Sequence, residues 1–174
     1  ASGGRKVVCE LVSFMDERLL LMPYGSLEGI GLGCRVEVEN AAPVIYPHPS
    51  WLGRIINAFG EAIDGKGPLI KGSKPYYIKS SPPPAQFRDR VCGKVDLGVK
   101  AVNAFLTICK GQRMGIFAGS GVGKSTLISM MAKNTDSDIS VIGLIGERGR
   151  EAKEFVEDTL GEEGLAKSVL VLAT

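Results

Sequence analysis

One nine-residue segment constrains the fold of this chain more than any other. Residues 118–126 read AGSGVGKST, which matches the phosphate-loop pattern G-x-x-x-x-G-K-[ST] except that Ala118 replaces the first glycine. The apolar run 113–118 is typical of a buried strand, and residues 124–133 have helical spacing. A strand that passes through a glycine loop into a helix begins a βαβ unit, so this segment predicts a parallel sheet.

The residues after the loop continue the same alternation. Residues 139–145 and 168–173 are two further apolar runs of strand length. Between them, residues 151–160 predict an amphipathic helix that ends at Gly161, with Ala152, Phe155, Val156 and Leu160 on one face. Residues 96–106 predict another helix ahead of the loop. Strands that alternate with helices predict the α/β class, with helices flanking a parallel sheet.

The first part of the chain has a different pattern. Residues 7–12, 19–22 and 35–39 are strand-length runs separated by turns and glycines, and strict alternation in the third predicts a half-exposed strand. This pattern is typical of a small barrel or antiparallel sheet. The Pro82-Pro83-Pro84 run lacks backbone donors and favours an extended chain, so it marks a boundary before the α/β region.

Composition excludes several classes of protein. Of 174 residues, 44% are hydrophobic and 23% charged, which excludes disorder, collagen and a coiled coil. The net charge of +2 gives no overall reason to expect DNA or an acidic membrane as partner. Residues 66–94 nevertheless hold seven Lys or Arg against one acid, and residues 135–163 hold nine acids against three bases. Two interpretations fit: like subunits that meet face to face, or solvated faces.

The four cysteines and the single histidine predict no metal site. Cys9, Cys34, Cys92 and Cys109 have no zinc-like spacing, and His48 alone cannot complete a histidine metal site or a Ser/His/Asp triad. No apolar run approaches the length of about 20 residues that a membrane span needs. We see no secretory leader, so we expect a soluble protein in a reducing cytosol.

The glycine loop has the chemistry of a phosphate cradle. Small residues let successive backbone N–H groups turn inward around a triphosphate, and the following helix directs its positive end at the same place. Lys124 then supplies a charge for the β- and γ-phosphates, and the Ser125 hydroxyl is placed to ligate Mg²⁺. The alternative is a plain strand-to-helix turn. The predicted nucleotide-binding residues are Gly119, Ser120, Gly121, Val122, Gly123, Lys124, Ser125 and Thr126.

A second motif follows the strand predicted at 139–145. Residues 146–151 read GERGRE, and in an open parallel sheet they lie at the same edge as the phosphate loop. There the Glu147 carboxylate can polarise the water that attacks the γ-phosphorus, and the Arg148 guanidinium can brace the charge on the γ-oxygens. A solvated loop is the alternative. We predict Glu147, Lys124 and Arg148 as the catalytic residues.

Taken together, these motifs resemble the catalytic subunits of rotary ATPases and type III export ATPases. Residues 52–69, 97–103, 111–125 and 143–151 carry the resemblance, which covers nearly the whole chain and is most specific from Leu97 onward. The AGSGVGKS loop and the GERGRE form resemble the export branch, and the F-type β subunit differs at both. Residues 101–106 and 168–174 are most similar to the flagellar export ATPases, also called flagellum-specific ATP synthases.

The resemblance implies a partial RecA-like P-loop NTPase core, with a parallel sheet and flanking helices, preceded by part of a small N-terminal β-barrel. It divides the chain into residues 1–46 (partial barrel), 47–84 (connecting segment and Pro-rich linker) and 85–174 (first half of the ATPase domain). It implies ATP as substrate, Mg²⁺ as cofactor, and hydrolysis that energises flagellar protein export through a type III apparatus. Glu147 then corresponds to the glutamate that activates water, and Arg148 to the arginine that approaches the γ-phosphate.

The resemblance also implies partners and a location. We expect a homohexamer with nucleotide between subunits, a regulator of the ATPase, a central stalk protein, export chaperones with their cargo, and a membrane export gate. No nucleic acid is expected. The implied location is cytoplasmic, at the inner face of the cytoplasmic membrane, with membrane association only through partners.

The chain is also expected to be an excerpt of such an enzyme. Its first residues fall inside the barrel region, and Thr174 falls before the points where the Walker B aspartate, the arginine finger and the adenine-pocket residues would follow. These roles cannot be carried over to any residue of this chain. The chain by itself is expected to bind nucleotide weakly and to be inactive.

Four alternatives stay open beside the flagellar enzyme. The ATPase of virulence type III secretion has the same chemistry at the site. A rotary ATP synthase subunit is a further possibility. A ring helicase acting on RNA or DNA would use the basic and aromatic residues Lys71, Lys74, Tyr76, Tyr77 and Lys79. A non-catalytic ring subunit would need the loop but not the Glu147 carboxylate, so Glu147 argues against it.

Overall fold

The computed structural model describes residues 6–39, 43–119 and 121–173. By its internal contacts the chain separates into two compact units, one up to residue 41 and one from residue 42 onward. Each is described by itself.

The first unit contains a β-hairpin. Strand β1 (Cys9–Met15) pairs antiparallel with β2 (Arg18–Pro23), with a bulge between Leu11 and Ser13. The turn between them places Asp16 at φ 49°, in the left-handed region that Asp tolerates better than most residues. In the described part of this unit no closed barrel forms. The strand expected at 35–39 is wrong, because those residues lack the ladder partner that a strand requires.

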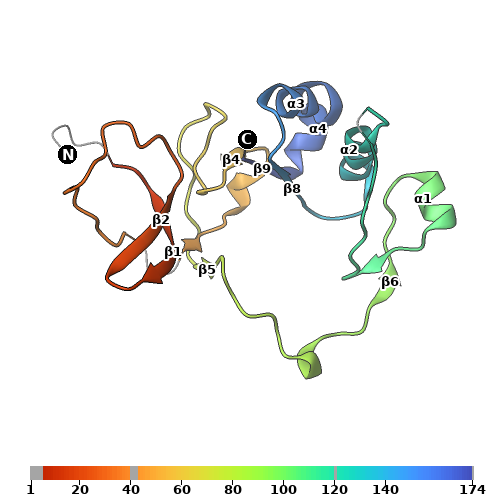
Figure 1. Cartoon of the computed structure of the whole chain (residues 1–174). Coiled ribbons are helices and arrows are strands. Elements are labelled where there is room, and N and C mark those ends of the chain that lie inside the picture. Colours follow the sequence, from red (N-terminus) through yellow and green to blue (C-terminus); the bar gives the residue numbers. More distant parts are fainter. Residues whose placement is uncertain (1–5, 40–42, 120, 174) are drawn as a thin grey trace. The chain divides into compact units, whose positions relative to one another are not determined.

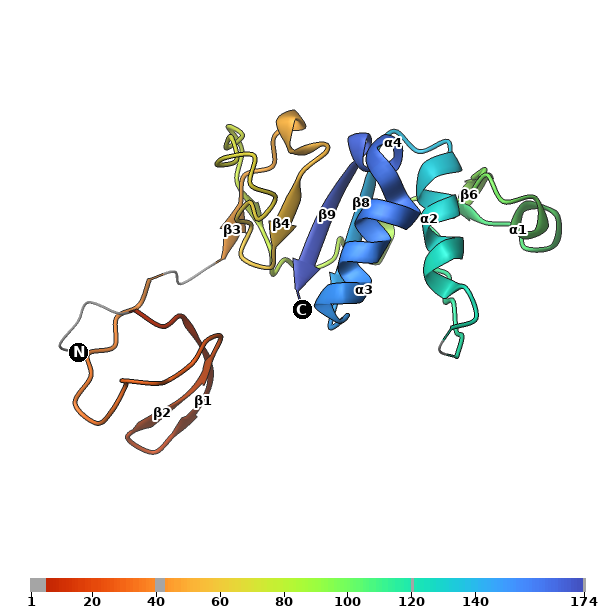
Figure 2. The same ribbon diagram turned by 90° about the horizontal axis from the view of Figure 1, so that it is seen from above.

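The second unit is built on a three-stranded parallel sheet, which confirms the predicted class (Figure 2). Its strand order is β4 (Ile55–Asn57), β9 (Ser168–Ala173) and β8 (Ser140–Ile145). Residues 55–57 pair with 170–172, and residues 140–145 pair with 168–173, all in parallel register. The apolar runs of the sequence predict β8 and β9 closely, but they indicate no strand at residues 55–57.

Helices cover this sheet on the side of β8 and β9 (Figure 2). They are α2 (Lys124–Asn134), α3 (Gly149–Glu154), a π-helix (Phe155–Leu160) and α4 (Gly161–Ala166). The predicted apolar face is confirmed, since Ala152, Phe155 and Leu160 are buried and Val156 is half-buried. The predicted helix end at Gly161 is confirmed, because Gly161 is the C-cap residue of the π-helix with φ 65°, and the separate helix α4 follows it.

The core lies between these helices and the sheet. It consists of Ala132, Ile142, Phe155, Leu160 and Leu170, with Ile55, Ile128 and Leu165 packed around them. In α2 the buried positions are Ser129 and Ala132, whereas Met130 is 43% exposed.

The remaining elements are short (Figure 1). They are β3 (Val44–Ile45), paired with β5 (Tyr76–Tyr77); β6 (Cys92–Lys94), paired with β7 (Cys109–Lys110); α1 (Lys100–Phe105); and 3₁₀ turns at Pro49–Trp51 and Ala85–Phe87. Helix α1 is shorter than the predicted 96–106. No helix in the described ranges has the length and apolarity needed to span a membrane.

The strand predicted at 113–118 is not formed. Those residues belong to no helix or strand, and the side chains of Phe117 and Met114 are 96% and 41% exposed. A β-strand exists only when its N–H and C=O groups pair with a neighbouring strand. In the described residues the sheet ends at β8, and nothing pairs with 113–118.

A buried ion pair holds the turn after β4. Arg54 Nε and Nη2 donate to the two carboxylate oxygens of Asp64 at 2.6 and 2.9 Å, and both side chains are mostly buried. Asp64 also accepts from the backbone N–H groups of Ile55 and Lys66. These donors, the Arg54 side chain foremost, hold the pKa of Asp64 well below its usual range.

We expect Asp64→Asn to destabilise the second unit by about 2 kcal/mol, because the amide cannot accept the same charged hydrogen bonds. The folded-state pKa of Asp64 is lowered. Its contribution to stability is therefore present above the unfolded value of about 3.9 and is lost as pH falls through the folded value. Urea unfolding can be followed by the fluorescence of Trp51, the single tryptophan of the chain. The variant should show less acid destabilisation than the wild type, and identical acid profiles would contradict this role.

A second tight contact joins the end of α2 to the segment before α1. Thr135 Oγ1 and the Asp136 N–H both donate to the Asp96 carbonyl, at 3.1 Å each. Gly98 lies so close to Asn134 that an added Cβ would stand 2.1 Å from the Asn134 Cβ. Only glycine fits this approach, so Gly98 keeps the end of α2 docked.

Replacement of Gly98 by Ala should therefore destabilise the unit more than the same change at Gly65. Both glycines have a positive φ, of 69° and 71°, but a Cβ at Gly65 meets nothing within 4 Å. The backbone strain is thus matched and only the clash differs. Thermal unfolding of both variants measures the difference, and equal losses would show that the close approach is unimportant.

Candidate nucleotide site

The loop ahead of α2 has the backbone geometry that glycine allows. Gly121 and Gly123 have φ of 74° and 93°, a region that other residues rarely adopt. A Cβ at either would meet no atom within 4 Å, so the loop surface is open. Val122 is 68% exposed, Gly119 belongs to no element, and Ser120 lies outside the described residues. Exposed backbone N–H groups at the start of a helix can bind an anion.

Gly123 is the N-cap of α2, and no side chain caps the helix there. The first N–H groups of an α-helix have no partner within the helix. Lys124 and Ser125 occupy the first turn, and Thr126 follows them on the same helix. The loop and the helix start therefore present backbone donors, one ammonium group and one hydroxyl together.

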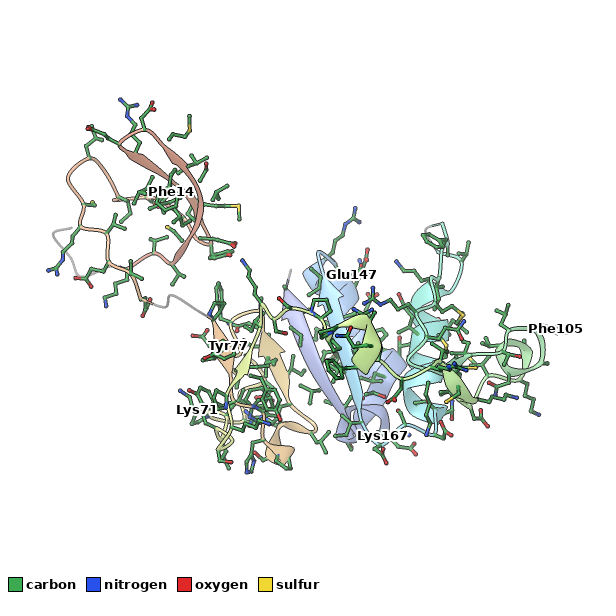
Figure 3. All side chains as sticks on the ribbon, turned by 90° about the horizontal axis from the view of Figure 1, so that it is seen from below. Phe14, Lys71, Tyr77, Phe105, Glu147 and Lys167 are labelled. Carbon is green, nitrogen blue, oxygen red and sulfur yellow. The ribbon has the colours of Figure 1, made fainter. Side chains whose placement is uncertain are left out.

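The edge of the sheet supplies the opposing wall. After β8 the chain turns at Gly146, whose φ is 73°, and its N–H donates to the Ala173 carbonyl at 2.7 Å. This hydrogen bond ties the loop to the carboxyl end of β9. Glu147 follows directly, so two strand ends fix the position from which its side chain projects (Figure 3).

A cavity of about 200 Å³ lies between these walls. Its apolar floor comes from Ile128 on α2, Ile142 and Leu144 on β8, and Ala152 and Phe155 beyond. Its polar rim consists of Lys124, Ser125, Glu147 and Glu151. The structure thus brings three of the predicted site residues, Lys124, Ser125 and Glu147, to one hollow.

Lys124 and Glu147 face each other across the rim. The Lys124 Nζ atom lies 4.0 Å from Glu147 Oε1, with side chains 43% and 36% exposed. Both groups remain accessible to a ligand that enters from solvent. A phosphate placed near Lys124 would stand beside the Glu147 carboxylate, which is the relative position that water activation requires.

Arg148 is not brought to the cavity. Its side chain is 88% exposed and lies 3.8 Å from Glu151 Oε1, and it is absent from the cavity lining. Arg150 likewise turns outward and pairs with Glu154 at 2.8 Å. Arg148 precedes α3 as its N-cap residue. Its predicted role at the γ-phosphate is therefore not reproduced by the geometry of this chain.

Glu151 is the rim residue for which the motif predicted no role. It lies in the first turn of α3 and lines the cavity together with Glu147. Glu151 follows Glu147 by four residues, and this spacing in the sequence could have indicated that both carboxylates lie at the same site.

The donor set fits a nucleotide with Mg²⁺. Among the described residues, no group of three or more His, Cys, Asp or Glu side chains could hold a metal alone. Mg²⁺ in phosphate sites usually keeps several waters and takes one or two protein ligands plus phosphate oxygens. The Ser125 hydroxyl beside Lys124 meets that need, and the open glycine loop leaves room for the phosphates.

Comparison with known proteins covers the region that contains this site. Residues 98–174 match the family model described as ATP synthase alpha/beta family, nucleotide-binding domain. Over this range, the chain is similar to the nucleotide-binding domain of the ATP synthase alpha/beta family. The match contains the glycine loop, the GERGRE motif and all four rim residues of the cavity.

Relatives of known name cover nearly the whole chain. It is 56% identical over 172 residues to the flagellum-specific ATP synthase of Caulobacter vibrioides, with 99% of this chain and 39% of the relative aligned. The flagellum-specific ATP synthase of Bacillus subtilis is 46% identical over 171 residues, covering 98% of this chain and 39% of that protein. The chain thus spans about two fifths of the length of these relatives.

Solved structures of the same kind share the fold. The assembled ATPase EscN from the type III secretion system of enteropathogenic E. coli is 32% identical, with a TM-score of 0.83 over 99% of this chain and 42% of that one. EscN in complex with its central stalk EscO is 33% identical, with a TM-score of 0.86 over the same shares. The partial RecA-like core predicted from sequence is confirmed.

Lys124→Ala should weaken the binding of ATP to this chain by about tenfold or more, because it removes a charged contact to phosphate. Titration of a fluorescent ATP analogue measures the change. The matched control is Lys153→Ala, since Lys153 is exposed on α3 and pairs with Glu157 at 3.8 Å. Unchanged affinity in the Lys124 variant would contradict the phosphate loop.

Proposed function

We propose that the protein is an ATPase that couples ATP hydrolysis to the export of flagellar proteins. The observation that carries the ATPase part is the cavity that Lys124, Ser125 and Glu147 line together. The names of the relatives, at 46% and 56% identity, support the flagellar part.

The chemistry follows from the positions of these residues. The loop N–H groups and Lys124 bind and orient the β- and γ-phosphates. Ser125 would hold Mg²⁺, which would supply positive charge at the phosphate oxygens. Glu147 accepts a hydrogen bond from a water molecule and aligns it with the γ-phosphorus.

The finer roles are also part of the proposal. We keep Glu147 as the general base, Lys124 as the electrostatic stabiliser and Gly119, Ser120, Gly121, Val122, Gly123 and Thr126 as loop contacts to the nucleotide. Arg148 would take part only after its side chain moves away from Glu151, 3.8 Å from it in this structure.

The ATPase of virulence type III secretion is the second candidate. Sequence identity favours it less than the flagellar enzyme. The structural neighbours from type III secretion are 32% to 39% identical, below the 40% to 56% of the flagellar relatives. One of these neighbours, EscN, was solved in complex with its central stalk EscO. By analogy we propose a ring of like subunits with a stalk partner, positioned at the cytoplasmic face of the membrane by a regulator, chaperones and an export gate.

Glu147→Gln in the full-length protein should keep ATP binding and lower turnover by about 100-fold or more, because the amide cannot take the proton from water. Phosphate release and nucleotide binding are measured on the same preparation. Glu154→Gln, on the exposed face of α3, is the matched control. Near-normal turnover in this variant would contradict the assignment of Glu147 as the general base.

The export role can be tested by complementation. The full-length protein should restore flagellar filaments to a Caulobacter vibrioides strain that lacks its flagellum-specific ATP synthase, and the Glu147→Gln form should not. Turnover in vitro together with failure to restore filaments would leave an ATPase but refute the flagellar role.

A further inference from the structure

A basic and aromatic surface lies at the β4 edge of the second unit. Lys71 and Lys74 place their ammonium groups 5.8 and 5.3 Å from the ring centres of Tyr46 and Tyr76. Tyr76 and Tyr77, on β5, are 51% and 62% exposed. Within the described ranges neither lysine forms an ion pair. We call these five residues the basic surface, of which Figure 3 labels Lys71 and Tyr77.

The cation–π contacts give this surface a defined shape. A lysine packed over a ring loses part of its rotational freedom before any partner arrives, so less entropy is lost on docking. The exposed tyrosine rings add flat apolar area with a polar end, a composition that is enriched in interfaces. A partner that carries carboxylates would complement the two ammonium groups of this surface.

The same chain carries such an element. Helix α4 and the π-helix before it expose Asp158, Glu162 and Glu163. None of these three forms an ion pair in the part of the chain that is described, whereas Glu151, Glu154 and Glu157 on the same helical segment are paired with Arg or Lys. We call the three unpaired acids the acidic face.

The two surfaces lie apart in one copy. Strands β3 and β4 flank β9 on one side, and helices α3 and α4 lie over β8 and β9 on the other (Figure 2). Contact between a surface and a different surface of a second copy is heterologous, and such contacts build rings or open chains. Residues 66–94 have a net charge of +6 and residues 135–163 a net charge of −6. The first region of one copy therefore attracts the second region of another copy.

We propose that the basic surface docks the acidic face of a second copy of this chain, head to tail. This inference rests on the proposed assembly of like subunits and adds to it the residues that meet. Because both partners are largely exposed, the contact is sensitive to salt and sets the orientation of the copies more than their affinity.

Paired charge reversals test the proposal on the 174-residue chain. One variant carries Lys71→Glu and Lys74→Glu, and the other carries Glu162→Lys and Glu163→Lys. Sedimentation velocity at about 0.05 M and about 0.5 M salt should show self-association of the wild type at low salt only. Each variant alone should associate about tenfold more weakly. An equimolar mixture of the two should recover association, because each mixed pair regains one native contact.

The matched control changes Lys100 and Lys110 to Glu. Both are exposed, and the net charge changes by the same amount as in the basic-surface variant. This control should associate like the wild type. Recovery on mixing cannot arise from a folding defect, because misfolded variants do not rescue each other.

Three outcomes overturn the proposal: a wild-type chain that stays monomeric at low salt, reversals without effect, or a mixture that associates no better than its components. Binding of a single-stranded DNA at the basic surface, without association of copies, would also overturn it and identify a nucleic-acid site. ATP affinity of the same samples reports on the phosphate loop. A wild-type chain that binds ATP but does not associate at low salt would therefore refute the surface and leave the ATPase proposal standing.

Discussion

The parallel pairing of β9 with strands on both sides is the interaction on which the second unit depends. Leu170 and Ser168 are fully buried, and Leu170 is paired with Ile55 on one side and Ile142 on the other. Because β8 and β9 run in register, their carboxyl ends finish at the same level, and the Gly146 to Ala173 hydrogen bond closes that end. The position of Glu147 opposite α2 is a consequence of this ladder.

Much of this arrangement could be predicted from short segments of the sequence. Apolar runs predicted β8 and β9 to within a residue or two, and the glycine loop predicted the start of α2 at Lys124. The phosphate-loop pattern and the GERGRE motif sufficed to bring Lys124, Ser125 and Glu147 together, since parallel strands end at a common edge. Each of these features depends on residues close together in sequence, or on a general rule of parallel sheets.

What escaped prediction depends on partners distant in sequence. Residues 55–57 form a strand because β9 lies beside them, although they are only three residues long. Residues 113–118 have the composition of a strand, but in the described structure no neighbouring strand pairs with them. Composition alone therefore gave a wrong prediction here. The outward turn of Arg148 toward Glu151 depends on the local start of α3, which a motif does not encode. Packing and pairing, rather than propensity, decide such positions.

The π-helix has a consequence for how this region tolerates changes in length. Its wider turn separates the buried residues Phe155 and Leu160 by five positions, yet both reach the core. Removal of one residue from this turn would restore α-helical winding and leave the helical faces before and after it nearly in phase, because a π turn accommodates one residue more than an α turn. Gly164, whose carbonyl accepts the buried Ser168 hydroxyl at 2.6 Å, would then keep that contact. The wide turn therefore absorbs one extra residue between α3 and α4 while the side chains on both sides of it still face the core.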